Sequence, residues 1–274
     1  MTLIDVLLLI IGIAFGAAGT AWLTARFDLK RANFRGARIP ACGGLVFVLA
    51  AAFTYGVSWF LDGAHPGSKA AYILCVVGFG LLGFWDDVKG DRSVGGFRGH
   101  LGALAKGKIT TGFIKLLGGG IISAAAALML WYPFWSHCLV AFLLIPLMAN
   151  TINLLDLRPG RSLAAFFLFA MAIFAYLAKQ DDLPIGYFLY IAIAIAVFLY
   201  PLDSTGQIML GDTGANAFGA VLGVAMVLYF PLWGQIAVVV ALVAFNVWCE
   251  KYSFSKTIEN NKILRGIDRK IGVR

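Results

Sequence analysis

The chain has 274 residues, of which 61% are hydrophobic and only 13% are charged, and its formal net charge is +8. Soluble domains carry about 25% charged residues, so the composition excludes an ordinary soluble protein and predicts a membrane protein. The four cysteines are scattered through apolar stretches without a C-x-x-C pair, which argues against a disulfide framework or a structural zinc site.

Nine apolar stretches approach the length of about 20 residues that a helix needs to cross a bilayer. We therefore expect an all-α polytopic membrane protein, with one transmembrane bundle over residues 1–252 and a basic, amphipathic tail over 253–274. The expected spans are 2–25, 39–61, 69–85, 109–132, 135–155, 162–178, 183–200, 211–230 and 232–252.

The placement of Lys and Arg predicts the orientation in the membrane. These residues gather after the first, third and fifth expected spans and in the tail, which lie on one side of a nine-span bundle. An excess of Lys and Arg marks the cytoplasmic face. The N-terminus is therefore expected outside and the C-terminus inside, in a multi-pass protein of the plasma membrane. The basic face suits an anionic leaflet or a phosphorylated substrate and does not call for nucleic acid.

The segment GFWDDVKG (83–90) ends the third expected span with two adjacent carboxylates, Asp86 and Asp87. Neighbours on a helix point about 100° apart, so the two side chains are expected to have different partners. One would contact a metal or a substrate, and the other would lie nearer to a lipid phosphate. The alternative is a solvated helix end.

The segment NTINLLD (150–156) ends the fifth expected span. Asn150, Asn153 and Asp156 recur every three residues, so they form one stripe on a helix. Such a stripe can orient a sugar, a nucleotide or a ligated metal. Hydrogen bonding between helices is the alternative, and it stays open for Asn150 in particular.

The segment LGDTGAN (210–216) is typical of a tight turn that leads into a helix. Asp212 is expected to cap this helix, with free backbone N–H groups beyond it that suit an anion. Carboxylates from several helix ends on one face predict a Mg²⁺ site, because Mg²⁺ takes few protein ligands and bridges to phosphates.

Four segments in this order, IPACGG (39–44), GFWDDVKG, NTINLLDLRPG (150–160) and GDTGAN, resemble those of the polyprenyl-phosphate N-acetylhexosamine-1-phosphate transferase superfamily, which is glycosyltransferase family 4. The resemblance extends to about residue 250. It implies a Mg²⁺-dependent enzyme, with Mn²⁺ as the alternative ion. A polyprenyl phosphate would attack the β-phosphorus of a nucleotide-diphosphate sugar and release a nucleoside monophosphate, so that a lipid-linked cell-envelope glycan begins.

The resemblance also implies roles for particular residues. Asp86 and Asp87 would be catalytic, and Asp212 with Asp156 would bind the metal. The substrate-binding residues would be Asn150, Asn153, Asp156, Lys89, Lys115, Arg158, Gly43 and Gly44. For Lys115, which lies inside an expected span, snorkelling to the membrane surface is an alternative.

The chain also departs from the family pattern. Pro159 stands where the pentapeptide transferases carry a second aspartate, and the tail replaces a histidine-bearing loop and a last span. These differences predict a related lipid-linked glycan instead of the standard pentapeptide product. Leu264, Ile267 and Ile271 share one helical face, so the tail is expected to lie on the membrane surface.

Two other functions compete with catalysis. A non-catalytic relative would act as a scaffold or regulator of envelope glycan synthesis, but clustered carboxylates without a cation would repel one another. A transporter or flippase would show interrupted segments in two corresponding halves, and the sequence shows none. The G-x-x-x-G pairs at Gly12–Gly16 and Gly219–Gly223 suit either a homodimer or packing within one chain.

Overall fold

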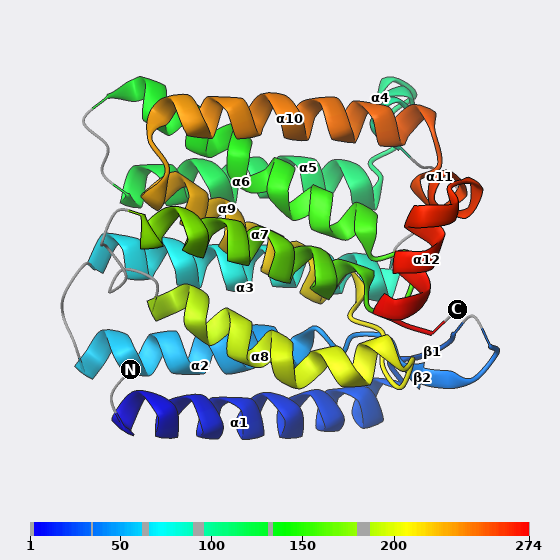
Figure 1. Cartoon of the computed structure of the whole chain (residues 1–274), viewed down its shortest axis with the longest axis horizontal. Coiled ribbons are helices and arrows are strands. Elements are labelled where there is room, and N and C mark those ends of the chain that lie inside the picture. The colour runs from blue at the N-terminus through cyan, green and yellow to red at the C-terminus, as the bar shows by residue number, and fades with distance from the viewer. Residues whose placement is uncertain are drawn as a thin grey trace.

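The computed structural model describes residues 3–33, 35–61, 66–89, 96–130, 134–179 and 187–273, and it shows an all-α bundle with one short hairpin. The long helices lie side by side along one axis (Figure 1). The elements are α1 (Leu3–Phe27), β1 (Lys30–Ala32), β2 (Arg38–Pro40), α2 (Leu45–Leu61), α3 (Pro66–Lys89), α4 (Gly96–Ala105), α5 (Thr111–Met129), α6 (Trp135–Leu155), α7 (Arg161–Ala178), α8 (Tyr187–Ser204), α9 (Gly211–Tyr229), α10 (Leu232–Lys251), α11 (Phe254–Asn260) and α12 (Lys262–Ile271).

The helices make this a polytopic membrane protein. Within the described residues, 7 helices are long and apolar enough to cross a bilayer, and α2 and most of α8 are apolar but shorter. Each of these helices overlaps one expected span. The N-terminus and the C-terminus lie at opposite ends of the bundle (Figure 1), as an odd number of membrane crossings requires. The count of nine and the orientation stay predictions.

Three expected boundaries are wrong by a helical turn or more, and one of them is the end of the span 183–200, since α8 continues to Ser204. The second helix begins at Leu45 and not at residue 39, because residues 38–40 form β2 and pair with β1 in the register Lys30–Pro40. The third helix does not end at residue 85 but continues to Lys89, so the paired aspartates lie in its last turns. The short helix α4 and the hairpin were not expected.

Helix α9 lies at the centre of the bundle and packs against α3, α6 and α7. Most of its residues are buried, because the Gly and Ala residues of α9 let neighbouring backbones approach closely. A Cβ added at Gly219 would lie 2.6 Å from the Ala149 Cα of α6. Large rings fill the space on the other side, where Phe47 stacks on Phe218 with ring centroids 3.8 Å apart.

In both G-x-x-x-G pairs, the glycines pack against another helix of the same chain. Gly12 and Gly16 lie against the backbone of α2, and Gly219 and Gly223 lie against α6. The alternative of packing within one chain is therefore confirmed for these glycines. A homodimer stays a prediction that they do not support.

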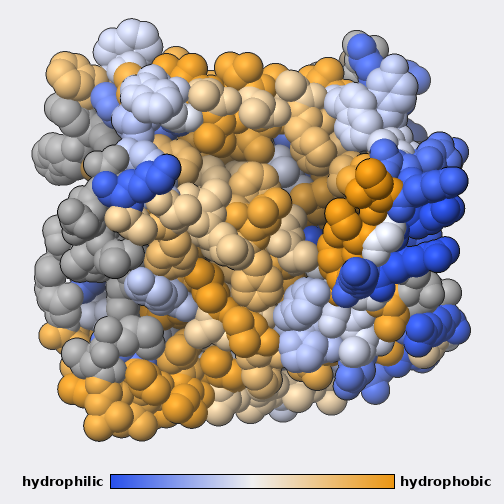
Figure 2. Space-filling model, in the orientation of Figure 1, coloured by the Kyte–Doolittle hydropathy of each residue, from blue (hydrophilic) through white to orange (hydrophobic). Residues whose placement is uncertain are grey.

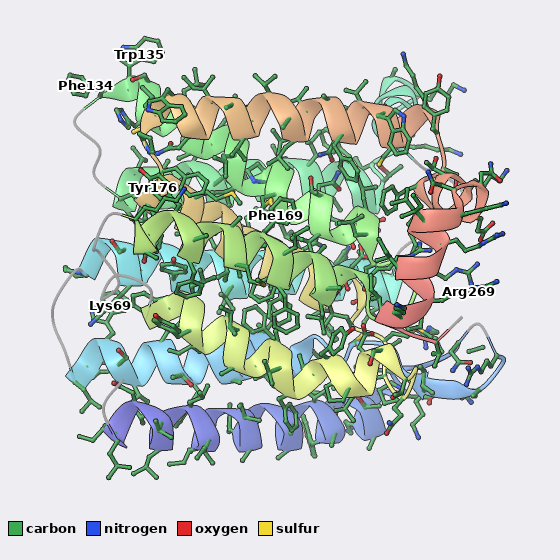
Figure 3. The ribbon with its side chains drawn as sticks, viewed as in Figure 1. Lys69, Phe134, Trp135, Phe169, Tyr176 and Arg269 are labelled. Carbon is green, nitrogen blue, oxygen red and sulfur yellow. The ribbon has the colours of Figure 1, made fainter. Side chains whose placement is uncertain are left out.

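The two ends of the bundle differ in chemistry. One end, which we call the site end, carries the hairpin, α4, α11 and α12 (Figure 1). Hydrophilic side chains gather along this end, next to a broad apolar band over the helices (Figure 2). At the opposite end lie Lys69, Phe134, Trp135 and Tyr176, whereas Arg269 lies at the site end (Figure 3). Aromatic residues at one border of an apolar band are typical of a membrane interface.

Candidate active site

The polar motifs come together at the site end, on the last turns of α3 and α6 and the first turns of α5 and α9. Lys115 of α5 is the centre of this cluster. Its Nζ donates a hydrogen bond to Asp86 Oδ2 at 3.0 Å and forms a second, short ion pair with Asp212. The side chain of Lys115 is 20% exposed, so the charges are partly withdrawn from water. Lys115 therefore belongs to the site, and snorkelling does not describe its contacts.

Asp87 points away from Asp86, as the helical geometry predicts, and binds the start of α9. Its carboxylate accepts hydrogen bonds from the backbone N–H groups of Asp212 and Thr213, at 3.0 and 2.9 Å, and from Thr213 Oγ1 at 2.5 Å. A carboxylate at a helix N-terminus is stabilised by the helix dipole. Asp87 therefore links α3 to the first turn of α9.

This contact corrects the prediction for Asp212. Helix α9 begins at Gly211 with Leu210 as its N-cap residue, and no side chain of the cap position bonds to the helix. Asp212 lies in the first turn, and two N–H groups expected to be free for an anion are bonded to Asp87. Gly211 has φ +72°, and an added Cβ would lie 2.8 Å from Asp87 Oδ2, so glycine suits this position.

Asn153 joins the cluster from α6. Its Nδ2 donates to Asp212 Oδ2 at 3.3 Å, whereas its Oδ1 is buried without a hydrogen-bond partner. Buried polar atoms are nearly always paired, so an unpaired oxygen beside a carboxylate suggests a missing cation or donor. Within the described residues, no three His, Cys, Asp or Glu side chains are arranged to hold a metal ion by themselves. Mg²⁺ stays a prediction.

The stripe on α6 does not converge on one point. Asn150 Nδ2 donates to Asn246 Oδ1 of α10 at 2.5 Å, which is the helix-to-helix bond left open as an alternative. Asp156 caps the C-terminus of α6 and accepts a bond from Ser162 Oγ of α7. The three side chains thus contact three different helices, because steps of three residues rotate around a helix that has 3.6 residues per turn.

Asp156 lies just beyond α6 in a region rich in carboxylates. Burial, and then the nearby Asp203 carboxylate, hold the pKa of Asp156 well above its usual range. A bound cation would favour the ionised form of both groups. The described hydrogen bonds do not connect Asp156 to Asp212, so their shared role as metal ligands stays a prediction.

Asp203 lies beside the cluster, and the sequence motifs predicted no role for it. It is only 3% exposed, and its two oxygens accept from the N–H groups of Gly160, at 2.8 Å, and Leu210, at 3.3 Å. It therefore joins the turn after α6 to the turn before α9. Its position in the last turn of an apolar helix was the only signal in the sequence.

Gly43 and Gly44 lie where the chain enters α2 and pack beneath the site. Their N–H groups donate to the carbonyls of Met209 and Leu210 at 2.8 Å each. A Cβ at Gly44 would lie 2.2 Å from Gly214 Cα of α9. The glycines therefore allow the two backbones to approach closely, and a direct contact with substrate stays a prediction.

Lys89 and Arg158 lie at the same end but outside the bonded cluster. Lys89 Nζ lies 4.6 Å from the ring centroid of Trp85, and Arg158 lies 3.9 Å from Glu259 of α11 in a partly exposed pair. Both side chains can change partners at low cost, because exposed cation–π contacts and exposed ion pairs each contribute little. Their role in binding phosphates stays a prediction.

Comparison with known proteins identifies the family of this chain. The family model described as "Glycosyl transferase family 4" matches residues 70–230, which is more than half of the chain. The chain belongs to glycosyl transferase family 4. The matched region of this family 4 enzyme includes Asp86, Lys115, Asn153 and Asp212, whereas Gly43 and Gly44 precede it. The family assignment and the expectation of a phosphotransferase are thus confirmed, and a non-catalytic scaffold is not supported.

Relatives of the family 4 enzyme carry the name phospho-N-acetylmuramoyl-pentapeptide-transferase. The protein from Streptococcus equi subsp. zooepidemicus (strain MGCS10565) is 27% identical over 262 residues, which cover 87% of this chain and 75% of the relative. The one from Limosilactobacillus fermentum is 28% identical over 233 residues, covering 80% and 69%. The one from Campylobacter curvus is 28% identical over 218 residues, covering 68% and 59%.

Proposed function

We propose that this family 4 enzyme transfers a phospho-sugar from a nucleotide-diphosphate sugar to a polyprenyl phosphate at the cytoplasmic face of the plasma membrane. The product would begin a lipid-linked cell-envelope glycan. The family and the names of the relatives support a polyprenyl phosphate acceptor. The observation that carries the proposal is Lys115 between Asp86 and Asp212, where apolar helices end. A lipid phosphate and a water-soluble donor can meet at such a position.

The reaction is a phosphoryl transfer. An oxygen of the lipid phosphate forms a bond to the β-phosphorus of the donor, and the bond from that phosphorus to the bridging oxygen breaks. The nucleoside monophosphate leaves with that oxygen. Such transfers depend mainly on positioning and on neutralising the phosphoryl oxygens. In our proposal Lys115 supplies positive charge to these oxygens, and Asp86 accepts a proton that the lipid phosphate carries.

Asp87 has a different task in this proposal. Both of its oxygens already accept bonds from the start of α9. It therefore positions Asp212 instead of acting as the base, and the predicted catalytic pair divides into one reacting group and one positioning group. This division follows from the neighbouring helix positions of the two residues.

The residues present fit a divalent cation. Asp212 offers a carboxylate, and Asn153 offers a buried, unpaired oxygen beside it. Mg²⁺ is usually held by one or two carboxylates together with substrate phosphates, so a protein site with few ligands is sufficient. We propose that Asp212 holds Mg²⁺, or alternatively Mn²⁺, with Asn153 and Asp156. The ion would neutralise the diphosphate as charge develops.

The proposal can be tested with the purified protein in nanodiscs that contain undecaprenyl phosphate and Mg²⁺. Release of nucleoside monophosphate is measured for a panel of nucleotide sugars with and without a muramoyl pentapeptide. We expect release with one donor, loss of release with EDTA, and rates about 10²–10³-fold lower in Lys115→Met and Asp212→Asn. Lys108→Met removes an exposed lysine just before the same helix and is expected to leave the rate unchanged.

The paired aspartates provide a second comparison in the same assay. Asp86→Asn is expected to lower kcat with an unchanged melting temperature. Asp87→Asn is expected to lower both, because it weakens the hold on α9. No release from any donor, with lipid binding retained, would contradict catalysis and favour a scaffold. The donor that reacts decides whether the departures at Pro159 and in the tail changed the substrate.

A further inference from the structure

The C-terminal helix α12 is held in one orientation by a buried ion pair. The guanidinium of Arg161, at the start of α7, donates from Nε and Nη2 to the two oxygens of Asp268, at 2.5 and 2.9 Å. Arg161 is 5% exposed and Asp268 is 6% exposed. Arg161 Nη1 also donates to Ser255 Oγ of α11 at 2.9 Å. A buried, bidentate pair of this kind fixes geometry and leaves an uncompensated charge if one partner is lost.

The end of α12 is bound as well. Tyr200 Oη of α8 donates to the Ile271 carbonyl at 2.7 Å, and Val273 N donates to the Ser204 carbonyl at 2.8 Å. A Cβ at Gly272 would lie 2.3 Å from the Pro159 carbonyl oxygen, so the backbones touch there. The ion pair at Asp268 and the contacts at the C-terminal end of α12 together prevent its rotation about its own axis.

The fixed orientation leaves an amphipathic surface uncovered. Ile263, Leu264 and Ile267 are 76%, 40% and 52% exposed and share one helical face. Exposed Arg265 and Arg269 occupy the other side of the helix, and the exposed Lys262 and Lys270 lie at its two ends. Apolar residues that the described part of the protein leaves exposed, next to cations, are typical of a helix that lies in a membrane interface.

The position of α12 suits this environment. The helix crosses the ends of the transmembrane helices at the site end (Figure 1). Apolar atoms near α12 face the apolar band of the bundle, and hydrophilic atoms form the outer edge (Figure 2). Arg269 points away from the bundle (Figure 3). The apolar stripe is therefore directed to the level of the lipid chains and the cations to the level of the headgroups.

We propose that α12 binds the surface of an anionic membrane, with Ile263, Leu264 and Ile267 in the acyl boundary and its cations at lipid phosphates. Each Lys or Arg near an anionic leaflet adds attraction. We also infer a relay, in which the ion pair of Asp268 with Arg161 links the membrane contact of α12 to the start of α7, where Ser162 bonds to Asp156. This second part gains functional meaning from the proposed active site, but its geometry does not depend on it.

The lipid contact is tested by hydrogen exchange of the full-length protein in nanodiscs of pure phosphatidylcholine or of phosphatidylcholine with phosphatidylglycerol. We expect the amides of residues 262–271 to exchange about tenfold more slowly in the anionic discs. The triple change Lys262→Gln, Arg265→Gln and Arg269→Gln should abolish this difference. The matched control, Lys106→Gln with Lys108→Gln, removes exposed cations at the same end and should retain it. Equal exchange in both lipids would overturn the proposal.

The relay is tested by the same measurement on another segment. Asp268→Asn should speed exchange of the amides at residues 157–163 by about tenfold, because Arg161 loses its charged partner. Glu259→Gln removes the exposed partner of Arg158 and should leave these amides unchanged. Unchanged exchange in Asp268→Asn would disprove the relay. Since neither readout uses turnover, an inactive enzyme would not be confused with a failed anchor.

Discussion

At the scale of single residues, the geometry of Asp203 predicts a large effect from a small change. Asn keeps one acceptor oxygen but puts an NH₂ group where the carboxylate accepts from Gly160 or Leu210. Losing one bond to a buried charge should lower the free energy of unfolding by about 2 kcal/mol. Thermal unfolding in one detergent measures this for Asp203→Asn. Asp28→Asn, in an exposed pair with Arg38, is the control and should melt like the parent protein.

Which polar residues come together was easier to predict from the sequence than the partners of each side chain. Asp86, Lys115, Asn153 and Asp212 do meet, because ionisable groups at helix ends near membrane depth need partners. The bonds of Asp87 to α9 and of Asn150 to α10 were not predictable. These bonds depend on which helices are neighbours and on how each helix is rotated about its axis. The sequence pattern of one helix indicates neither.

At the scale of helices, close approach explains why particular positions are glycine. A Cβ at Gly219 would lie 2.6 Å from the Ala149 Cα and the Met148 carbonyl oxygen. Gly219→Ala should therefore push α9 from α6 and cost about 1–3 kcal/mol, which lowers the melting temperature. Gly56→Ala, where an added Cβ would meet no other described element within 4 Å, is the matched control within α2. Equal melting temperatures for the two variants would contradict this packing.

The long helices were predictable because lipid imposes a length and a composition on each of them. The expected span 135–155 coincides with α6. The hairpin and α4 lie outside the hydrocarbon, where no such rule applies, and they were missed. The start of α2 was misplaced because apolar residues 39–44 read as helix, whereas their backbone bonds to β1 and to the 209–210 segment.

At the scale of the whole molecule, the distribution of Lys and Arg predicts that the site end faces the cytoplasm. Single cysteines can test this after Cys42, Cys75, Cys138 and Cys249 have been changed to Ser. A membrane-impermeant maleimide on intact cells should label Trp135→Cys, at the opposite end. It should label Lys106→Cys only after the cells are opened, because position 106 lies at the site end. The reverse pattern would show that the protein is inserted the other way.

The position of the whole cluster at one end of the bundle has a consequence for the lipid product. In the proposed reaction, a sugar joined to a lipid diphosphate there would enter the leaflet that borders the site end. Moving its charged and hydroxylated headgroup through the hydrocarbon would strip it of water at a prohibitive energy. The proposed product would therefore accumulate on one side of the membrane, and its use on the other side would require a separate translocating protein.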